Sequence, residues 1–465
     1  MKFLNEDHIL ANGTGVYTKL RRDALKMLES ALDSVDPKES IYNKVKVEED
    51  KLTIEDKMYD LDRFKRVYLV GGGKAGGSMA EAIESLLGDR LTGGIVNILQ
   101  GTEGKYHLRR VKLVGASHPV PNEAGVRGVA QMLSMVSGLT SRDLVIVIIS
   151  GGGSALMPSP AEGITLDDMQ AITERLLKKG VTINDLNAVR KHLDSFKGGQ
   201  LAQRCQPANV LSLILSDVVG DPLDTIASGP TAPDSTTWVD AENVLRKYDS
   251  WKDAPEPIRR RVEKGVMGEI PETPKSNDQA FSKIYNVLVA NNSYAAEAAS
   301  KKATELGYNS MILSTMVEGE ARQVGSVYAG IAREVASRSR PISAPAAIII
   351  GGETTVDVKG SGNGGRNQEV ALGATKRIAG TPCLVASLAT DGIDGPTDSA
   401  GAIVDGATLK RITKLNLSID ATLRENDAYH LFEKVEDLLI TGPTGTNVND
   451  LALILVAGEW RDAHS

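Results

Sequence analysis

The residues of this chain that could do chemistry stand in glycine-rich loops. In the first loop, VGGGKAGG at 70–77, Lys74 lies among five glycines. Glycines let backbone N–H groups approach a phosphate at a helix N-terminus, and a mobile ammonium can neutralise charge on a transferring phosphoryl group. We interpret Gly72 and Gly73 as room for Lys74 and the backbone to reach a ligand. A solvated lysine on a tight turn is the structural alternative, and spacing alone does not decide between the two.

The same loop also matches the GxGxxG pattern of dinucleotide-binding folds. Such a fold normally adds an acidic residue at the end of the next strand, where it binds the ribose hydroxyls. The next expected strand, GIVNILQG at 94–101, offers Asn97 but no carboxylate. A reductase that uses NAD(P)H is therefore the weaker interpretation of this loop.

Polar and charged side chains recur in the loops after the next apolar runs. The segment SGGGSALMPSP at 150–160 could form an anion-binding nest of backbone N–H groups, and the basic run at 187–202 lies between two candidate ligand loops. Asp217 ends a strand-like run, where a carboxylate can hold Mg²⁺ or accept a hydroxyl proton. A strand-ending turn, a solvated helix face and an acidic turn are the structural alternatives. The candidate binding residues in this half are His118, Ser150, Gly151, Gly152, Ser154, Arg190 and Lys197.

The second half of the chain carries similar loops. Arg366 lies in GNGGRNQE at or near an expected helix start, where it could clamp a carboxylate or a phosphate with two N–H groups. Asp391 belongs to the acidic segment TDGIDGPTD, whose spacing does not match an EF-hand and fits magnesium–phosphate chemistry better. Further candidate binding residues are Glu353, Asn363, Thr444 and Asn447.

Together these loops offer glycine cradles, a lysine, an arginine and several aspartates. No Ser-His-Asp or Cys-His arrangement stands in a recognisable motif context. The inventory suits phosphoryl transfer, in which positioning and charge neutralisation do most of the catalysis. Asp217 or Asp391 would be the catalytic base or a metal ligand, and the sequence does not choose between them.

The pattern of apolar runs predicts the elements that must position these loops. An amphipathic helix is expected at 16–33, and β-branched runs ahead of glycine-rich or acidic loops then alternate with helix-like segments. We expect two parallel-sheet α/β domains, the first Rossmann-like, with ligands bound outside the carboxyl ends of the strands. The expected boundaries are 1–235 for the first domain, 236–280 for a connecting region and 281–465 for the second domain.

Length, composition and charge limit the classes of protein to which this chain can belong. The chain of 465 residues is long enough for two domains, and it is 41% hydrophobic and 24% charged, like an ordinary globular protein. A net charge of −7 without a long basic block disfavours nucleic acid or an anionic membrane as partner. The apolar runs are too short for a membrane span, and the N-terminus does not resemble a signal peptide, so we expect a cytosolic protein. Cys205 and Cys383 form no zinc or disulfide pattern, and the sequence leaves a homodimer open.

At these residues the chain resembles the type-2 glycerate kinases, the family whose C-terminal part is called the MOFRL domain. The resemblance implies two α/β domains with the active site in the cleft between them, and the use of ATP with Mg²⁺ or another divalent cation. It marks Lys74 and Arg366 as the catalytically important pair. The family often has aspartate where this chain has Asn122, which puts a carboxylate role at that position in doubt. The segments that carry the resemblance are, in order, GGGKA, ASHPVPN, SGGGSAL, VRKHLDSFKGGQLA, LSDVVGDPLDTIASGPT, GGETTV, GNGGRNQE, TDGIDGPTD and TGPTGTNVND.

The resemblance also implies a reaction, the phosphorylation of D-glycerate with release of ADP. It favours the 2-hydroxyl as the acceptor and 2-phosphoglycerate as the product. Three alternatives stay open: a glycerate kinase that gives 3-phosphoglycerate, an NAD(P)H-dependent hydroxypyruvate reductase, and a sugar-phosphate-sensing module without catalysis.

Overall fold

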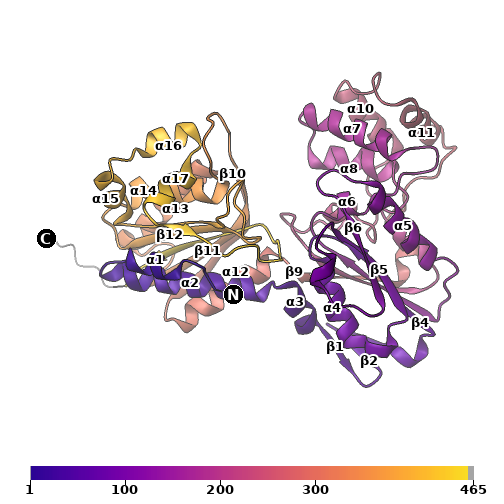
Figure 1. The fold of residues 1–465 in the computed structure, drawn as a ribbon, viewed down its shortest axis with the longest axis horizontal. Coiled ribbons are helices and arrows are strands. Elements are labelled where there is room, and N and C mark those ends of the chain that lie inside the picture. The colour runs from indigo at the N-terminus through magenta and orange to yellow at the C-terminus, as the bar shows by residue number, and fades with distance from the viewer. Residues whose placement is uncertain (1, 459–465) are drawn as a thin grey trace. The chain divides into compact units, whose positions relative to one another are not determined.

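The computed structural model describes residues 2–458, which fold into two compact units. One unit comprises residues 37–289, and the other combines the N-terminal residues up to Asp36 with those from Ala290 onward. Figure 1 shows the indigo N-terminal helices against the orange and yellow elements of the second unit. These units differ from the expected domains 1–235 and 281–465, because the first helices pack with the C-terminal half of the chain.

The unit of residues 37–289 is built on a six-stranded sheet with the order β6-β5-β4-β7-β8-β9. Numbered within this sheet, the order is 3-2-1-4-5-6, which is that of dinucleotide-binding folds. Strands β4, β5, β6, β7 and β8 pair in parallel. The strands are β4 (Arg66–Gly72), β5 (Gly93–Leu99), β6 (Val111–Ala116), β7 (Asp143–Ile149), β8 (Asn209–Leu215) and β9 (Ile284–Ala290). The expected Rossmann-like parallel sheet is confirmed.

Helices cover both faces of this sheet because its strands are apolar on both sides. On one face Val70, Val145 and Val147 pack with Val129 and Met132 of α5 (Glu123–Met135). On the other face, Gly76 at the start of α4 (Gly76–Leu87) lies against the side chains of Val96 and Ile98. Figure 1 shows α4 and α5 on opposite sides of the strands. Asn122 caps α5, since its Oδ1 accepts a hydrogen bond from the Gly125 amide.

A cluster of helices stands at one end of this unit (Figure 1). Its core contains Ile172, Val189, Trp238 and Val262, one from each of α7 (Leu166–Lys178), α8 (Ile183–His192), α10 (Trp238–Lys247) and α11 (Glu256–Val266). Residues 236–280 were expected to connect two domains, and they instead supply α10 and α11 to this core. Residues 284–290 were expected to be the first strand of the second domain, and they instead form the sixth strand of the first sheet.

Smaller elements complete the unit. A charged stretch that precedes the first sheet forms an antiparallel meander of β1 (Val45–Glu48), β2 (Lys51–Ile54) and β3 (Lys57–Asp60). The short helices are α3 (Pro37–Lys44), α6 (Gly153–Leu156) and α9 (Gln200–Arg204), with single 3-10 turns at Leu61–Arg63, Gly88–Arg90, Glu103–Lys105, Ile226–Ser228 and Gln279–Lys283.

The second unit has a six-stranded sheet of order β10-β11-β15-β12-β13-β14. Only the β10–β11 pair is parallel, while β15 runs antiparallel to both of its neighbours and β13 antiparallel to β12 and β14. The expected parallel sheet is therefore wrong for this unit. Continuous apolar runs such as LALILV indicate buried strands but not their direction. The strands are β10 (Asn309–Glu320), β11 (Ala346–Thr355), β12 (Cys383–Ala389), β13 (Gly401–Asp405), β14 (Leu438–Leu439) and β15 (Asp450–Val456).

Helices sandwich this second sheet (Figure 1). Helices α13 (Ala321–Arg338) and α14 (Arg366–Ile378) pack on one face, and α2 (Val16–Ser34) and α12 (Asn292–Glu305) pack on the other. The expected opening helix is confirmed by α2, whose Arg21 is fully buried and ion-paired with Asp405 and Asp437. The remaining helices are α1 (Glu6–Ala11), α15 (Thr408–Lys414), α16 (Ile419–Glu425) and α17 (Ala428–Lys434). Within residues 2–458, no helix is long and apolar enough to cross a membrane.

Candidate active site

Four of the predicted site segments meet at one edge of the first sheet. Lys74 follows β4, His118 follows β6, the segment 150–154 follows β7 and Asp217 follows β8. Because these strands are parallel, their carboxyl ends lie at the same edge. The strand order reverses between β4 and β7, and a crevice at such a switch point is the usual ligand site of an open α/β sheet.

Backbone hydrogen bonds join the loop after β4 to the loop after β7. The Lys74 amide donates to the Gly151 carbonyl at 2.9 Å, and the Ser150 amide donates to the Gly72 carbonyl at 3.2 Å. Ser150 is buried, and its Oγ accepts a hydrogen bond from the Ala75 amide at 3.1 Å. The backbone of Lys74 is thus fixed while its side chain is exposed, and the structure gives its ammonium no ion-pair partner among residues 2–458.

The surroundings of Gly151 and Gly152, in the loop after β7, show which side chains lie near Lys74. A methyl group on Gly152 would lie 3.0 Å from His118 Cδ2 and 3.3 Å from Lys74 Cε, and one on Gly151 would lie 2.2 Å from Asp217 Oδ2. Lys74, His118 and Asp217 therefore surround one pair of glycines. Burial and the charge of Lys74 lower the pKa of His118, so its imidazole is neutral at neutral pH.

Packing within the protein accounts for the glycines of the first loop. A methyl group on Gly71 would lie 2.0 Å from the Ile148 carbonyl oxygen, and one on Gly73 would lie 2.1 Å from Ser150 Oγ. A methyl group on Gly72 would lie 2.4 Å from the Asn97 carbonyl oxygen. We expected these glycines to make room for a ligand, and the structure gives them a different reason, which is the close approach of β4 to β5 and β7.

Asn97 lies two residues before the end of β5, the strand at whose end a dinucleotide-binding fold carries its ribose-binding acid. The side chain is buried, and its Nδ2 donates to the carbonyls of Gly125 at 3.0 Å and Leu156 at 2.7 Å. It therefore ties the start of α5 and the end of α6 to β5. An internal structural role replaces the contact that a nicotinamide cofactor would need there.

Arg190 and Lys197 come close to a common cavity but differ in what they can bind. Lys197 is buried, and its Nζ donates to Asp194 Oδ2 at 2.6 Å and to the Met157 carbonyl at 2.7 Å, so its charge is already compensated. Arg190 is half-buried and has no hydrogen-bond acceptor among the described residues. Burial lowers the pKa of Arg190, and Asp194 partly opposes this effect. Both side chains, with Ser154, line a cavity of about 290 Å³.

In the second unit, Arg366 is the first residue of α14, as the sequence predicted, and is held by carboxylates. Its Nε and Nη2 donate to the two oxygens of Asp450 at 2.6 and 2.9 Å, and its Nη2 lies 3.4 Å from Glu353 Oε1. Burial lowers the pKa of Arg366, but Asp450 and Glu353 outweigh it and raise the pKa overall. Burial raises the pKa of Asp450 and of Glu353.

Two functional partners were missed by sequence reasoning. Asp450 pairs with Arg366, and its only sequence signal is its place at the end of TGPTGTNVND. Asp394, which the sequence offered only as one of several aspartates in an acidic loop, accepts hydrogen bonds from the amides of Asn367 at 3.1 Å and Gln368 at 2.9 Å. It thereby fixes the first turn of α14, and burial raises its pKa to about 7 against the effect of these bonds.

The other predicted residues of this unit build its loops. Thr444 is buried, with its hydroxyl bonded to the Thr390 carbonyl at 2.6 Å and its amide bonded to the Asp391 carbonyl at 3.2 Å. Asn447 Oδ1 accepts from the Asn449 amide at 3.0 Å, and the Asn363 amide donates to Asp427 Oδ1 at 2.9 Å. A ligand contact at these positions stays a prediction.

A divalent cation bound with a nucleotide needs few protein ligands. Within the described part of the chain, no group of three or more His, Cys, Asp or Glu side chains is placed to hold a metal ion. Mg²⁺ in kinases is usually bound by one or two carboxylates together with substrate phosphates. Asp217 in one unit and Asp391 in the other could each offer one carboxylate, so the residues present fit a metal that arrives with the nucleotide.

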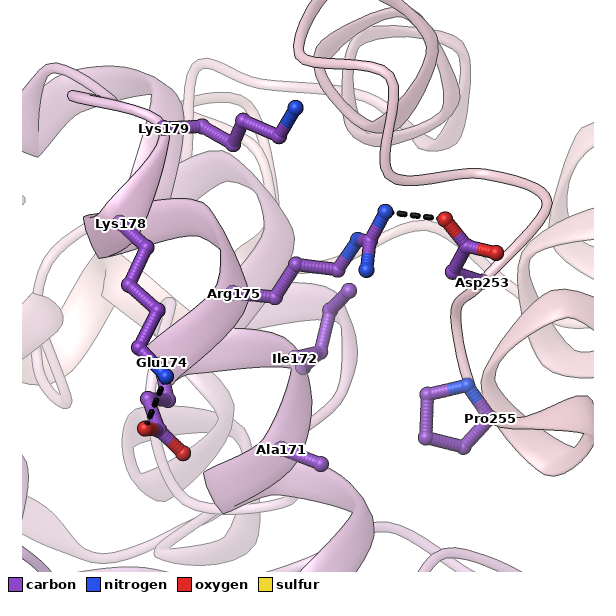
Figure 2. Close-up of a pocket in the computed structure, with 8 residues that line it drawn as sticks. All are labelled: Ala171, Ile172, Glu174, Arg175, Lys178, Lys179, Asp253 and Pro255. Atoms are coloured by element: carbon purple, nitrogen blue, oxygen red, sulfur yellow. Dashed lines mark hydrogen bonds and ion pairs between the residues drawn. The ribbon is translucent and has the colours of Figure 1, made fainter.

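A second surface pocket, which shares Glu174 with the cavity of about 290 Å³, lies between α7 and the segment that precedes α11 (Figure 2). Its volume is about 450 Å³. Arg175 pairs with Asp253, and Lys178 pairs with Glu174 at 2.6 Å, while the Lys179 side chain extends away from these groups. None of the predicted site residues lines this pocket.

Comparison with known proteins agrees with this geometry. A model described as a domain of unknown function, DUF4147, matches residues 23–263, and the MOFRL family model matches residues 346–450. The glycerate 2-kinase of Pyrococcus horikoshii is 40% identical over 441 residues, which cover 95% of this chain and 98% of that protein. The solved structure of the Thermotoga maritima glycerate kinase is 38% identical with a TM-score of 0.84, covering 94% of this chain and 100% of that one.

Another relative carries a different name. A protein of Agrobacterium vitis, provisionally named as a hydroxypyruvate reductase, is 41% identical over 394 residues, which cover 84% of this chain and 87% of that protein. Both kinds of relative align over most of this chain. The chain therefore belongs to the type-2 glycerate kinase family, in which a DUF4147 region is followed by a MOFRL region.

Proposed function

We propose that this protein is an ATP-dependent kinase that phosphorylates D-glycerate at its 2-hydroxyl, giving 2-phosphoglycerate and ADP. The names of the Pyrococcus and Thermotoga relatives, glycerate 2-kinase and D-glycerate 2-kinase, support both the reaction and the 2-position. Glycerate and the nucleotide are the small-molecule partners in this proposal. A cytosolic location belongs to the same proposal, and nucleic acid has no part in it.

The observation that carries the proposal is the setting of Lys74. Its backbone is fixed at the switch point of a parallel sheet, and its exposed ammonium has no ion-pair partner among the described residues. A positioned but uncompensated cation at such an edge suits an anion whose charge changes during a reaction. Phosphoryl transfer from ATP is a reaction of this kind.

Each of these residues has a proposed role in the reaction. The 2-hydroxyl oxygen of glycerate attacks the γ-phosphorus, the bond to the β,γ-bridging oxygen breaks, and ADP leaves. Asp217, which shares an edge with Lys74, accepts the hydroxyl proton. Lys74 and Arg366 stabilise the negative charge of the transferred group, and Asp450 holds Arg366 in its orientation.

Mg²⁺ would neutralise the phosphate charge of the bound nucleotide. Asp391, with the neighbouring 441–449 loop, is the proposed place for the metal-bearing nucleotide, since Asp217 is assigned to the proton. Glu353, Asn363, Thr444 and Asn447 remain the proposed binding residues of this loop region. A cleft between the two domains stays a prediction.

A hydroxypyruvate reductase is the second candidate. The strand order of the first sheet and the name of the Agrobacterium relative favour it. The end of β5 carries no acid to bind a ribose, and the nearby Asn97 is buried and bonded internally, which weighs against it. Oxidation of NADH by the protein with hydroxypyruvate, in the absence of ATP, would establish this activity.

Phosphorus NMR of the products is the decisive experiment. With D-glycerate, ATP and Mg²⁺, we expect one new monoester signal that coincides with added 2-phosphoglycerate, together with ADP in equal amount. A signal that coincides with 3-phosphoglycerate would correct the position. Ligand binding without any ADP release would favour a sensing module over a kinase.

A further inference from the structure

The cavity next to the Lys74 edge has a composition that suits a small hydroxy acid. It lies between the segment after β6, the segment after β7 and the helices α7 and α8. Its volume of about 290 Å³ stands at the lower end of the range of about 300–1000 Å³ typical of small-molecule sites. Most of its wall is apolar, with Pro119, Val120, Pro121, Ala155, Pro158, Met169 and Leu177.

Arg190 is the cation of this cavity that no described carboxylate holds by a hydrogen bond, and the charge of Asp194, which pairs with Lys197, offsets its burial only in part. Glu174 also lines it but pairs with Lys178 at 2.6 Å, and Lys197 pairs with Asp194 at 2.6 Å. Arg190 has no hydrogen-bond acceptor among residues 2–458. A half-buried guanidinium against an apolar wall attracts an anion strongly, because little water competes for its N–H groups.

Ser154 presents an oxygen to the same cavity. The Ser228 hydroxyl donates its one proton to Asn187 Oδ1 at 3.0 Å, with the Asn187 amide oxygen facing it. Ser228 must therefore accept the hydrogen bond that it shares with Ser154 at 2.9 Å. The Ser154 proton is used in this bond, so its oxygen can only accept further hydrogen bonds, and a ligand hydroxyl is a suitable donor.

We infer that this cavity is the subsite for the acceptor, in which Arg190 binds the carboxylate of a small hydroxycarboxylic acid and Ser154 accepts a hydrogen bond from the hydroxyl that is not phosphorylated. The inference rests on the proposed kinase function and adds residue roles to it. For phosphorylation at the 2-hydroxyl, Ser154 holds the 3-hydroxyl.

The cavity is joined to the proposed phosphate-transfer residues. Ser154 belongs to the loop whose Gly151 carbonyl binds the Lys74 amide, and Pro119 follows His118, which lies against Gly152. Gln170 Nε2 donates to the Pro121 carbonyl at 2.7 Å and so fixes this wall to α7. An acid bound at Arg190 thus lies next to the edge that carries Lys74 and Asp217.

The test compares steady-state kinetics of the full-length protein and variants at Arg190 and Ser154. We expect Arg190→Ala to raise the KM for D-glycerate about 10- to 100-fold, as for loss of a charge-assisted hydrogen bond, with the KM for ATP unchanged. Arg190→Lys should recover part of this loss. Glyceramide, in which a neutral amide replaces the carboxylate, should be a poor substrate of the wild type, and Arg190→Ala should discriminate little between it and glycerate.

Ser154→Ala gives an independent measurement. The wild type should prefer D-glycerate over D-lactate, which lacks the 3-hydroxyl, and Ser154→Ala should reduce this preference about 5- to 10-fold, as for one neutral hydrogen bond. The matched control is Arg175→Ala, an arginine on the adjacent helix that lines the surface pocket of Figure 2 and pairs with Asp253. Its glycerate and ATP constants should equal those of the wild type.

Each outcome has a distinct meaning. An unchanged KM for glycerate in Arg190→Ala, or an equal rise of the KM values for glycerate and ATP, would overturn the assignment of this cavity as the acceptor subsite. The proposed kinase function would still stand if the wild type phosphorylates glycerate. Absence of glycerate phosphorylation by the wild type would instead reject the proposed function itself. If Arg190→Ala does not fold, the KM for glycerate of Arg190→Lys and the preference of Ser154→Ala for D-glycerate over D-lactate test the assignment instead.

Discussion

Lys74 is the residue at which the proposed chemistry can be tested most directly. We expect Lys74→Ala to lower kcat about 100- to 1000-fold, because a preorganised charge that faces the transferred group is lost. Its exposed side chain makes no ion pair within residues 2–458, so the free energy of unfolding should change little. The control is Lys179→Ala, since Lys179 is an exposed lysine of the same unit (Figure 2). Wild-type turnover in Lys74→Ala would contradict the mechanism.

Arg366 requires a different design because it is part of a buried ion pair. Arg366→Ala leaves Asp450 buried without its cation, and we expect the free energy of unfolding to fall by about 3 kcal/mol. The double variant Arg366→Ala with Asp450→Asn removes that unpaired charge and should regain most of the stability. We expect kcat to stay at least about 100-fold below that of the wild type in both. Recovery of turnover along with stability in the double variant would assign Arg366 a purely structural role.

At the scale of elements, the start of α14 predicts a dependence of stability on pH. Burial raises the pKa of Asp394 to about 7, above its ordinary value of 3.8. The folded protein therefore keeps a proton between about pH 4 and 7 that the unfolded chain has released. The contribution of Asp394 to stability is greatest below pH 4 and falls as the pH rises to 7, by at most about 4 kcal/mol.

Urea unfolding between pH 4.5 and 7.5 measures this effect. The difference in free energy of unfolding between the wild type and Asp394→Asn should narrow as the pH rises, because only the wild type loses stability through this group. Carboxyl groups that do not interact with Asp394 contribute equally to both proteins and cancel in the difference, while the coupled Asp450 is part of the measured effect. A difference that does not change with pH would show that Asp394 is ionised throughout the range.

At the scale of the whole molecule, Arg21 ties the N-terminal helix to the sheet of the second unit. It is fully buried and donates to Asp405 at 2.6 Å and to Asp437 at 2.8 Å. We expect Arg21→Met to lower the free energy of unfolding of this unit by about 3 kcal/mol, since two buried carboxylates lose one of their two cations and keep only Arg411. Hydrogen exchange should show lost protection in β11, β12 and β15 and unchanged protection in β4 and β7. The neighbouring Arg22 is exposed, so Arg22→Met should change neither the free energy of unfolding nor the hydrogen-exchange protection.

Local patterns in the sequence determined several features correctly. The helix at 16–33, the strand ahead of Lys74, the helix that begins at Arg366 and the parallel first sheet follow from apolar periodicity and glycine punctuation, which act between near neighbours in the chain. The ordered loop motifs were enough to indicate the family. Each of these features depends on a few adjacent residues, so one sequence suffices to read it.

Only the tertiary structure decided which distant residues meet. It assigned the N-terminal helix to the C-terminal half, the strand at 284–290 to the first sheet and the antiparallel direction to β15. It also found Asp450 beside Arg366, and it distinguished the paired Lys197 from the unpaired Arg190, two residues that look alike in one basic run. Asp450 lies 84 residues from Arg366, and the burial of Lys197 depends on packing with segments such as that of Met157, 40 residues away, so local spacing carries no record of either.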